Sequence, residues 1–325
     1  MTRALITGVI GQDGSYLSEL LVAKGYEVFG MVRSLADPRI DALQRSSPEV
    51  RPVAGDLVDR ASLARALDAA APDEVYNLAA MSSARRSLED PVSAAEVNGV
   101  GPLRLLEALR AAAATRTRLF QASSSEVFGA PRESPQSERT QLRPRGPYGA
   151  AKAFAQQMVA NYREDHGLFA VSGILFNHES PRRGLEFVTR KISYHAAAIK
   201  LGKLARLELG NLDAERDWGF AGDVVRAMHL MLRRPIPDDL VIGTGETHTV
   251  REFAATAFAH VGLDWRDHVV TSAAHDRPAE TLPLRADTTR ARTELGWSPS
   301  VTFTELVVLM VESDLRLLAA GAPTR

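Results

Sequence analysis

The chain has 325 residues, of which 45% are hydrophobic and 24% are charged, with a formal net charge of −1 and no cysteine. This balance gives no overall attraction to nucleic acid or to an anionic membrane, and the missing cysteines exclude disulfides, thiol nucleophiles and cysteine metal sites. No apolar run approaches the roughly 20 residues that span a bilayer, and no signal peptide is evident. We therefore expect a cytoplasmic protein with neither nucleic-acid nor membrane partners.

In the first half of the chain, short apolar runs alternate with helical patterns. Strands are predicted at 4–7, 27–32, 50–54, 74–78 and 118–122. Helices are predicted between them at 16–24, 60–70 and 91–113. Such alternation predicts a parallel sheet that is covered by helices on both faces.

The second half begins with a helix predicted at 148–165 and a strand predicted at 168–176. Further on, prolines, charged turns and helical patterns are mixed, and a strand at 240–243 is expected to return to the main sheet. We predict an α/β fold, with a doubly wound, Rossmann-like domain over residues 1–177 and a smaller C-terminal α/β substrate lobe over residues 178–325. No flexible linker separates these two parts.

A glycine-rich turn follows the first strand and opens the first helix. Gly8, Gly11 and Gly14 are spaced three residues apart, with Gln12 and Asp13 between the last two. Glycine allows a tight turn and a close backbone approach to a pyrophosphate, and the helix N-terminus offers unpaired N–H groups to the anion. The turn therefore predicts a dinucleotide site.

The ends of the second and third strands bear on which dinucleotide is bound. An acid after the second strand suits the ribose of NAD, whereas an arginine suits the 2′-phosphate of NADP. Arg33 stands there and residues 31–36 include no acid, so NADP is favoured and NAD stays possible; alternatively, Arg33 is a solvated loop charge. Asp56 and Leu57 are placed to hold the adenine, or Asp56 caps the helix that starts near Asp59.

A Tyr-x-x-x-Lys pair indicates proton and hydride chemistry. Tyr148 and Lys152 share one face of a helix at i and i+4. A nearby ammonium favours the phenolate, so Tyr148 can take a proton from a sugar hydroxyl while hydride leaves the same carbon. Ser124, which follows the fifth strand, is placed to bond the same sugar oxygen.

Glu126, two residues beyond Ser124, distinguishes between reactions. Oxidation of a sugar at C4 makes a ketone that acidifies the C5 hydrogen, and a carboxylate can then remove that hydrogen while the C6 hydroxyl departs. A simple dehydrogenase or reductase does not need such a base. The alternative is that Glu126 is a solvated or helix-capping acid.

Longer motifs resemble one family. The Ser-Ser-Ser-Glu-Val-Phe-Gly run at 123–129 is similar to extended short-chain dehydrogenases. The stretch 173–184, which includes Asn-His-Glu-Ser-Pro-Arg-Arg-Gly, resembles the GDP-mannose 4,6-dehydratases more particularly. So do 8–17, 187–191, 209–211 with 216–219, and 277–280. The likeness covers nearly the whole chain, from the first strand to residue 297.

This resemblance implies an NADP-dependent enzyme that acts on a GDP-sugar and forms a homodimer or homotetramer. Separately, no second histidine or carboxylate is spaced to make a metal site, so no metal is expected. It assigns catalysis to Ser124, Glu126, Tyr148 and Lys152, with Ser124 in place of a usual threonine. Besides the residues already named, it assigns cofactor contacts to Leu78, Ala80, His178 and Arg183. It assigns substrate contacts to Ser82, Ser124, Asn177, Thr189, Lys191, Arg216, Arg277 and Glu280.

Two departures from the family pattern leave alternatives open. The family's Gln-Ser-His-Val-like segment is replaced at 81–87 by a run that contains Arg85 and Arg86, which either alter substrate choice or face solvent. Arg33 also lacks the adjacent second arginine that family members often carry. The competing functions are a reductase or epimerase of a related GDP-sugar, for which Glu126 is dispensable, and a dinucleotide-binding sensor without catalysis.

Overall fold

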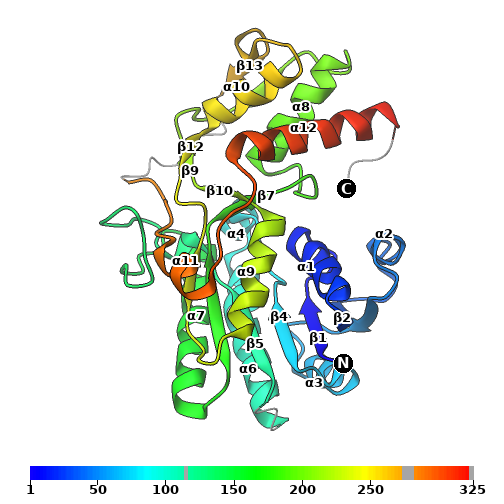
Figure 1. Ribbon diagram of the computed structural model, residues 1–325, viewed down its shortest axis with the longest axis vertical. Coiled ribbons are helices and arrows are strands. Elements are labelled where there is room, and N and C mark those ends of the chain that lie inside the picture. Colours follow the sequence, from blue (N-terminus) through cyan, green and yellow to red (C-terminus); the bar gives the residue numbers. More distant parts are fainter. Residues whose placement is uncertain (113–115, 273–281, 322–325) are drawn as a thin grey trace.

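The computed structural model describes residues 1–112, 116–272 and 282–321 (Figure 1). Within these residues, a seven-stranded sheet has the order β11-β6-β5-β4-β1-β2-β3, and every neighbouring pair in it is parallel. Its strands are β1 (Arg3–Thr7), β2 (Glu27–Val32), β3 (Arg51–Ala54), β4 (Glu74–Asn77), β5 (Arg118–Ala122), β6 (Ala170–Leu175) and β11 (Leu240–Ile242). The doubly wound fold is confirmed, and the chain order of the strands reverses beside β1.

The central strands are apolar on both faces because helices cover both sides. On one face, Leu5 of β1 lies opposite Phe29 of β2 and Val75 of β4, and all three are buried. On the other face, Ile6 of β1 lies opposite Tyr76 of β4, and both are buried. One face is packed by α1 (Gln12–Ala23) and α9 (Ala221–Arg233), and the other by α3 (Arg60–Ala70), α6 (Gly101–Ala111) and α7 (Pro147–His166). Two separate hydrophobic cores result, one on each face of the sheet.

The helix predicted at 91–113 is divided in the structure. It consists of α5 (Pro91–Ala95), a π-helical turn (Glu96–Val100) and α6, and Asp90 caps its start by accepting from the Ser93 amide at 3.0 Å. The structure also has two short helices that the sequence pattern does not predict, α2 (Arg39–Ser46) and α4 (Ala84–Glu89). Helices of six to eight residues contain too few turns to show a clear apolar period.

The C-terminal helices gather at one end of the sheet (Figure 1). They are α8 (Val188–Lys200), α10 (Val250–His260) and α12 (Phe303–Ala319), and they share a core that includes Ile192, Phe253 and Met310. Capping boxes start α10 at Thr249 and α12 at Thr302. The helix α11 (Thr289–Leu295) instead packs beside β11 and α9.

Short strand pairs connect these helices to the sheet. They are β7 (Asn177–Glu179) with β10 (Trp218–Phe220), β9 (Glu215–Arg216) with β12 (His248–Thr249), and β8 (Leu207–Leu209) with β13 (Val269–Thr271). Because β7 follows directly on β6, the chain passes from the end of the main sheet into the C-terminal part within two residues.

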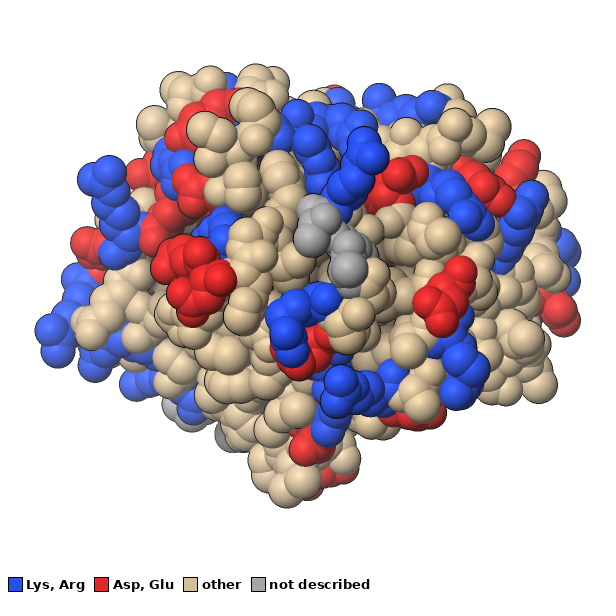
Figure 2. Space-filling view, turned by 90° about the horizontal axis from the view of Figure 1, so that it is seen from below, with Lys and Arg blue, Asp and Glu red and all other residues tan. Residues whose placement is uncertain are grey.

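Two surface properties bear on partners. Among the described residues, no helix has the combination of length and apolar character that a membrane span requires. On the surface that is seen from below the orientation of Figure 1, basic and acidic side chains are interspersed and do not form a patch of one sign (Figure 2). That face therefore presents no concentrated positive charge to a polyanion.

Candidate active site

The glycine turn brings the ends of β1 and β4 very close together. Gly8 has a φ of +70°, and a Cβ at this residue would lie 2.9 Å from the backbone of Ala79. A Cβ on Gly14 would lie 2.4 Å from the carbonyl oxygen of Gly8. A side chain at either position would therefore displace backbone, which explains both glycines.

The start of α1 suits an anion. Gly11 is its N-cap residue and provides no side chain to bond the N–H groups of the first turn. These groups and the positive end of the helix dipole lie at the point where the strand order reverses, which is where open parallel sheets bind ligands. The cradle therefore fits a dinucleotide pyrophosphate.

Gln12 and Asp13 connect this turn to the segment that follows β6. The Gln12 amide donates to the carbonyl of His178 at 3.1 Å, and the Asp13 carboxylate lies 2.9 Å from Nε2 of His178. Nδ1 of His178 lies 2.8 Å from the carbonyl of Phe176. Both ring nitrogens thus face acceptors, an arrangement that an imidazolium satisfies.

The charges of this pair support each other. Burial by itself raises the pKa of Asp13, but His178, Gln12 and Arg183 outweigh it and lower the pKa to about 2. Burial opposes the charge on His178 as well, yet Asp13 raises the pKa of its imidazole above the ordinary value. Three of the predicted cofactor residues are therefore neighbours in one polar cluster.

The other predicted cofactor residues occupy the ends of β2, β3 and β4. Arg33 is exposed directly after β2, while Leu78 and Ala80 are partly buried after β4. The Asp56 carboxylate accepts from the Val58 amide at 3.1 Å, and the cap of α3 is Asp59 rather than Asp56. Leu57 is buried against Gly101: a Cβ built on Gly101 would lie 2.9 Å from the Cβ of Leu57.

The four predicted catalytic residues meet where β5 ends and α7 begins. A Cβ on Gly149 would lie 2.4 Å from the Glu126 carbonyl oxygen, so the two segments are in direct contact. The Ser124 hydroxyl accepts from the Glu126 amide at 3.3 Å and is hydrogen-bonded to Tyr148. The hydroxyl, carboxylate and phenol thus come from two adjoining segments.

Lys152 lies beneath the phenol. Its Nζ atom is 5.9 Å from the ring centroid of Tyr148 and donates to the carbonyl of Ala122 at 2.8 Å. Burial lowers the pKa of Lys152 to about 8. Burial among protein atoms, with the charge of Glu126 nearby, raises the pKa of Tyr148 to about 12 although a Ser124 hydrogen bond opposes the rise. A cationic ligand bound beside this phenol, in addition to Lys152, would lower the pKa of Tyr148 towards neutral pH.

The predicted substrate residues lie in several environments. Asn177 is partly exposed at the start of β7, and Ser82 is exposed after β4. Thr189 is fully buried, and its hydroxyl donates to Glu179 at 2.7 Å. The Lys191 ammonium donates to the carbonyl of Glu208 at 2.6 Å.

The remaining predicted residues are Arg183 for the cofactor and Arg216, Arg277 and Glu280 for the substrate. Arg216, on β9, donates to the carbonyl of Glu215 at 2.6 Å. Arg183 forms an ion pair with Glu179 at 3.1 Å. Arg277 and Glu280 lie outside the described residues.

The chain is similar to known proteins over nearly its whole length. The family model for GDP-mannose 4,6 dehydratase matches residues 5–310. The chain belongs to the GDP-mannose 4,6-dehydratase family. GDP-mannose 4,6 dehydratase 1 of Arabidopsis thaliana is 49% identical over 97% of this chain and 90% of its own length. The GDP-mannose 4,6 dehydratase of Homo sapiens is 46% identical over 97% of this chain and 92% of its own length.

Solved structures of other proteins have the same architecture as this member of the GDP-mannose 4,6-dehydratase family. The dTDP-glucose 4,6-dehydratase DesIV of Streptomyces venezuelae, with NAD and TYD bound, has a TM-score of 0.85 and 27% identity over 99% of each chain. A Thermus thermophilus UDP-glucose 4-epimerase in complex with NAD has a TM-score of 0.82 and 28% identity over 96% of this chain and 99% of that one. The likeness to a dehydratase and an epimerase supports the fold of enzymes that act on nucleotide-sugars.

Asn98 is a residue near the site that no sequence motif indicates. This buried residue lies in the π-helical turn, where its side chain accepts from the Met81 amide at 2.8 Å and donates to the Met81 carbonyl at 3.1 Å. It thereby fixes the segment that carries Ala80 and Ser82. The sequence shows only one more polar residue in a helical pattern that also contains Ser93 and Glu96, which does not indicate a partner.

The segment 81–87, which departs from the family pattern, lies after β4 and includes the start of α4. Arg85 is exposed and pairs with Glu89 at 3.1 Å along α4. Arg86 is exposed as well, and its amide donates to Ser83, the N-cap of the same helix. In this conformation Arg85 is a surface ion-pair residue.

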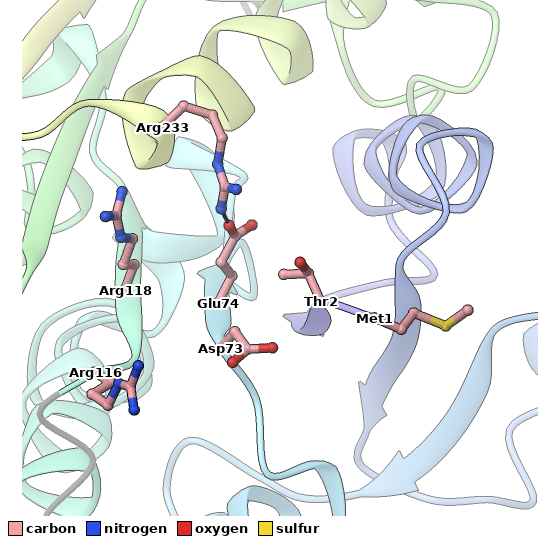
Figure 3. Close-up of a pocket in the computed structure, with 7 residues that line it drawn as sticks. All are labelled: Met1, Thr2, Asp73, Glu74, Arg116, Arg118 and Arg233. Atoms are coloured by element: carbon pink, nitrogen blue, oxygen red, sulfur yellow. Dashed lines mark ion pairs between the residues drawn. The ribbon is translucent and has the colours of Figure 1, made fainter.

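A pocket of about 520 Å³ lies at the opposite, amino edge of the sheet (Figure 3). Two of its arginines have protein partners: Arg118 donates to the Leu232 carbonyl at 2.5 Å, and Arg233 pairs with the buried Glu74. None of the predicted site residues of the GDP-mannose 4,6-dehydratase family lines this pocket. The glycine turn and Tyr148 lie instead at the carboxyl edge of the sheet.

Proposed function

We propose that the protein dehydrates GDP-mannose to GDP-4-keto-6-deoxymannose and uses NADP. The observation that carries this proposal is the junction of β5 and α7. It places a phenol (Tyr148), an ammonium (Lys152), a hydroxyl (Ser124) and a carboxylate (Glu126) beside one another. A base for C4 oxidation and a second base for C5 are what this internal oxidation and reduction requires.

Each residue has a separate task in this proposal. Tyr148 takes the proton of the C4 hydroxyl, Ser124 holds the same oxygen, and the Lys152 charge favours the phenolate. Held at the turn of Gly8, Gly11 and Gly14, a bound NADP⁺ would supply the oxidant for C4 and, in its reduced form, the reductant for C6. Glu126 takes the C5 proton that the C4 ketone has acidified and passes it to the C6 hydroxyl, which departs as water. When hydride reaches C6, C5 receives the proton that Tyr148 took from the C4 hydroxyl. The nucleotide-sugar loses one water in total, and the dinucleotide is unchanged.

The preference for NADP rests on the end of β2. Arg33 is exposed there, and the neighbouring residues 31–36 contain no acid that would repel a 2′-phosphate. A guanidinium can bond a phosphate through two N–H groups. We expect NADPH to bind more tightly than NADH, and Arg33→Ala to reduce that difference.

The deciding experiment is incubation of the purified protein with GDP-mannose and catalytic NADP⁺, followed by mass analysis. A product lighter by one water, without net change in NADPH, would support dehydration. Tyr148→Phe is the matched control, because it removes one oxygen and should abolish the product. Stoichiometric NADPH consumption would favour a reductase, and unchanged GDP-mannose with turnover of another nucleotide-sugar would move the activity to that sugar.

We also propose that the enzyme is a homodimer or homotetramer. Large apolar side chains are exposed on helices that pack together: Leu88 on α4 is 67% exposed, Val92 on α5 is 72% exposed and Phe154 on α7 is 42% exposed. An apolar surface of adjoining helices is a common subunit contact. Light scattering of the purified protein would give the number of subunits.

A further inference from the structure

The segment Ser180–Arg183 lies between the first helix and the C-terminal helices. On the α1 side, the Ser180 hydroxyl donates to the side-chain oxygen of Gln12 at 2.9 Å. Arg182 forms an ion pair with Glu19 at 2.9 Å, and its guanidinium stacks 4.0 Å from the ring centroid of Tyr16. The segment thereby contacts the first turn of the helix that holds the dinucleotide in the proposed function.

On the opposite side, the same segment is held by a buried ion pair. The Nε atom of Arg190 on α8 donates to the carbonyl of Pro181 at 3.2 Å. The other end of the guanidinium is bonded to Asp314 of α12, which also accepts from the Ser193 hydroxyl at 2.7 Å. Arg190 is 5% exposed and Asp314 is fully buried.

Stability alone gives little reason for this pair. Desolvation of two charges offsets much of their attraction, and apolar residues of similar volume often replace a buried pair without loss. An apolar pair, however, has no N–H group for the carbonyl of Pro181. The polar pair therefore provides a fixed donor at one point of the segment, in addition to filling the core.

We propose that Arg190, oriented by Asp314, is a positioning residue that fixes Ser180–Arg183 against α1 and so sets the affinity for the dinucleotide. The inference rests on the proposed function, because it takes the glycine turn as the dinucleotide site. Gln12 is the direct link, since it follows Gly11 in that turn and bonds both Ser180 and the carbonyl of His178. Loss of the Pro181 contact should loosen this link while leaving the catalytic junction of β5 and α7 in place.

Two variants separate positioning from stability. Arg190→Lys keeps a cation opposite Asp314 but has no Nε donor for Pro181, since an ammonium cannot span both acceptors as a guanidinium does. Arg190→Met combined with Asp314→Leu removes both charges and fills the core. Single removal of Asp314 is avoided, because it would leave an unpaired buried guanidinium.

Arg163→Lys is the matched control. Arg163 also pairs with an aspartate, Asp239, at 2.8 Å and donates to a backbone carbonyl, that of Ala170, at 2.8 Å. It lies on α7 beside the start of β6, at the other end of that strand from the segment in question. The same chemical change is thus made in a similar pair away from α1.

The measurements are the Tm, the Kd for NADPH by fluorescence titration, and kcat with KM for GDP-mannose at saturating NADP⁺. We expect both Arg190 variants to melt near the wild-type temperature and to bind NADPH about tenfold more weakly, with kcat largely kept, as loss of about one charged hydrogen bond would give. Arg163→Lys should bind NADPH as the wild type does. Wild-type affinity in Arg190→Lys, or in the folded double variant, would overturn the inference. A wild-type protein that binds no dinucleotide would instead overturn the proposed function.

Discussion

Replacing Lys152 with methionine should stabilise the protein while inactivating it. Lys152 is 2% exposed, and burial lowers its pKa to about 8 from an unfolded value of 10.5. Below pH 8 the native state must therefore hold a charge that water would solvate better. Methionine has a similar length and carries no charge, so it removes this penalty.

The magnitude follows from the pKa difference. A depression of this size corresponds to about 3 kcal/mol of unfolding free energy that is missing at pH 7. The hydrogen bond from Nζ to the Ala122 carbonyl returns about 1 kcal/mol. We expect Lys152→Met to raise the unfolding free energy by about 2 kcal/mol at pH 7. Because the unfolded state binds the proton more tightly, wild-type stability rises with pH between about 8 and 10.5, and the advantage of the variant disappears there.

Urea unfolding of the dinucleotide-free protein at pH 7 and pH 10 would measure this. Lys24→Met is the control, because Lys24 is exposed after α1 and its replacement should change stability by less than about 0.5 kcal/mol at both pH values. The kcat of Lys152→Met should fall by about 10²–10⁴. A variant that is less stable than wild type at pH 7, or whose stability difference does not change with pH, would refute the reasoning.

Three further outcomes are expected. Gly14→Ala should lower the unfolding free energy by about 1–3 kcal/mol and abolish NADPH binding, because the added Cβ would clash with the Gly8 carbonyl. Calorimetry and fluorescence titration would measure these effects, and unchanged NADPH binding would contradict the assignment of this turn as the pyrophosphate site. Glu126→Gln should lower the rate of dehydration by a factor of about 10²–10⁴, while the affinity for NADPH stays within about twofold of wild type. Full dehydratase activity of this variant, measured by mass analysis, would exclude Glu126 as the C5 base. Phe154→Glu should produce smaller particles in light scattering, whereas an unchanged particle mass would place the subunit contact elsewhere.

Local patterns were enough for the sheet because they reflect burial. The runs predicted as strands at 4–7, 27–32 and 118–122 match β1, β2 and β5 within one residue, since strands covered on both faces are apolar throughout. Gly8 and Gly14 were also recognisable, because close backbone approach excludes every other residue. The family resemblance was confirmed by the match over residues 5–310.

Polar contacts over long sequence separations could not be predicted in this way. Asp314 and Arg190 are 124 residues apart, and His178 and Asp13 are 165 residues apart. A single charged residue in a helical pattern has the same local sequence whether it faces solvent or a buried partner. Asn98 is comparable, because its partner is a backbone amide, which leaves no side-chain signal at Met81.

The sequence by itself determined the parallel sheet, the dinucleotide turn and the residues able to do proton chemistry, since each depends on residue type and short spacing. Only the tertiary structure decided which of these groups meet and what charge they hold. Packing of α7 on the Ser125–Val127 turn joins Tyr148 to Glu126, and desolvation by the whole fold moves the pKa values of Tyr148 and Lys152 in opposite directions. These effects depend on distances and burial between distant segments, which no local pattern contains.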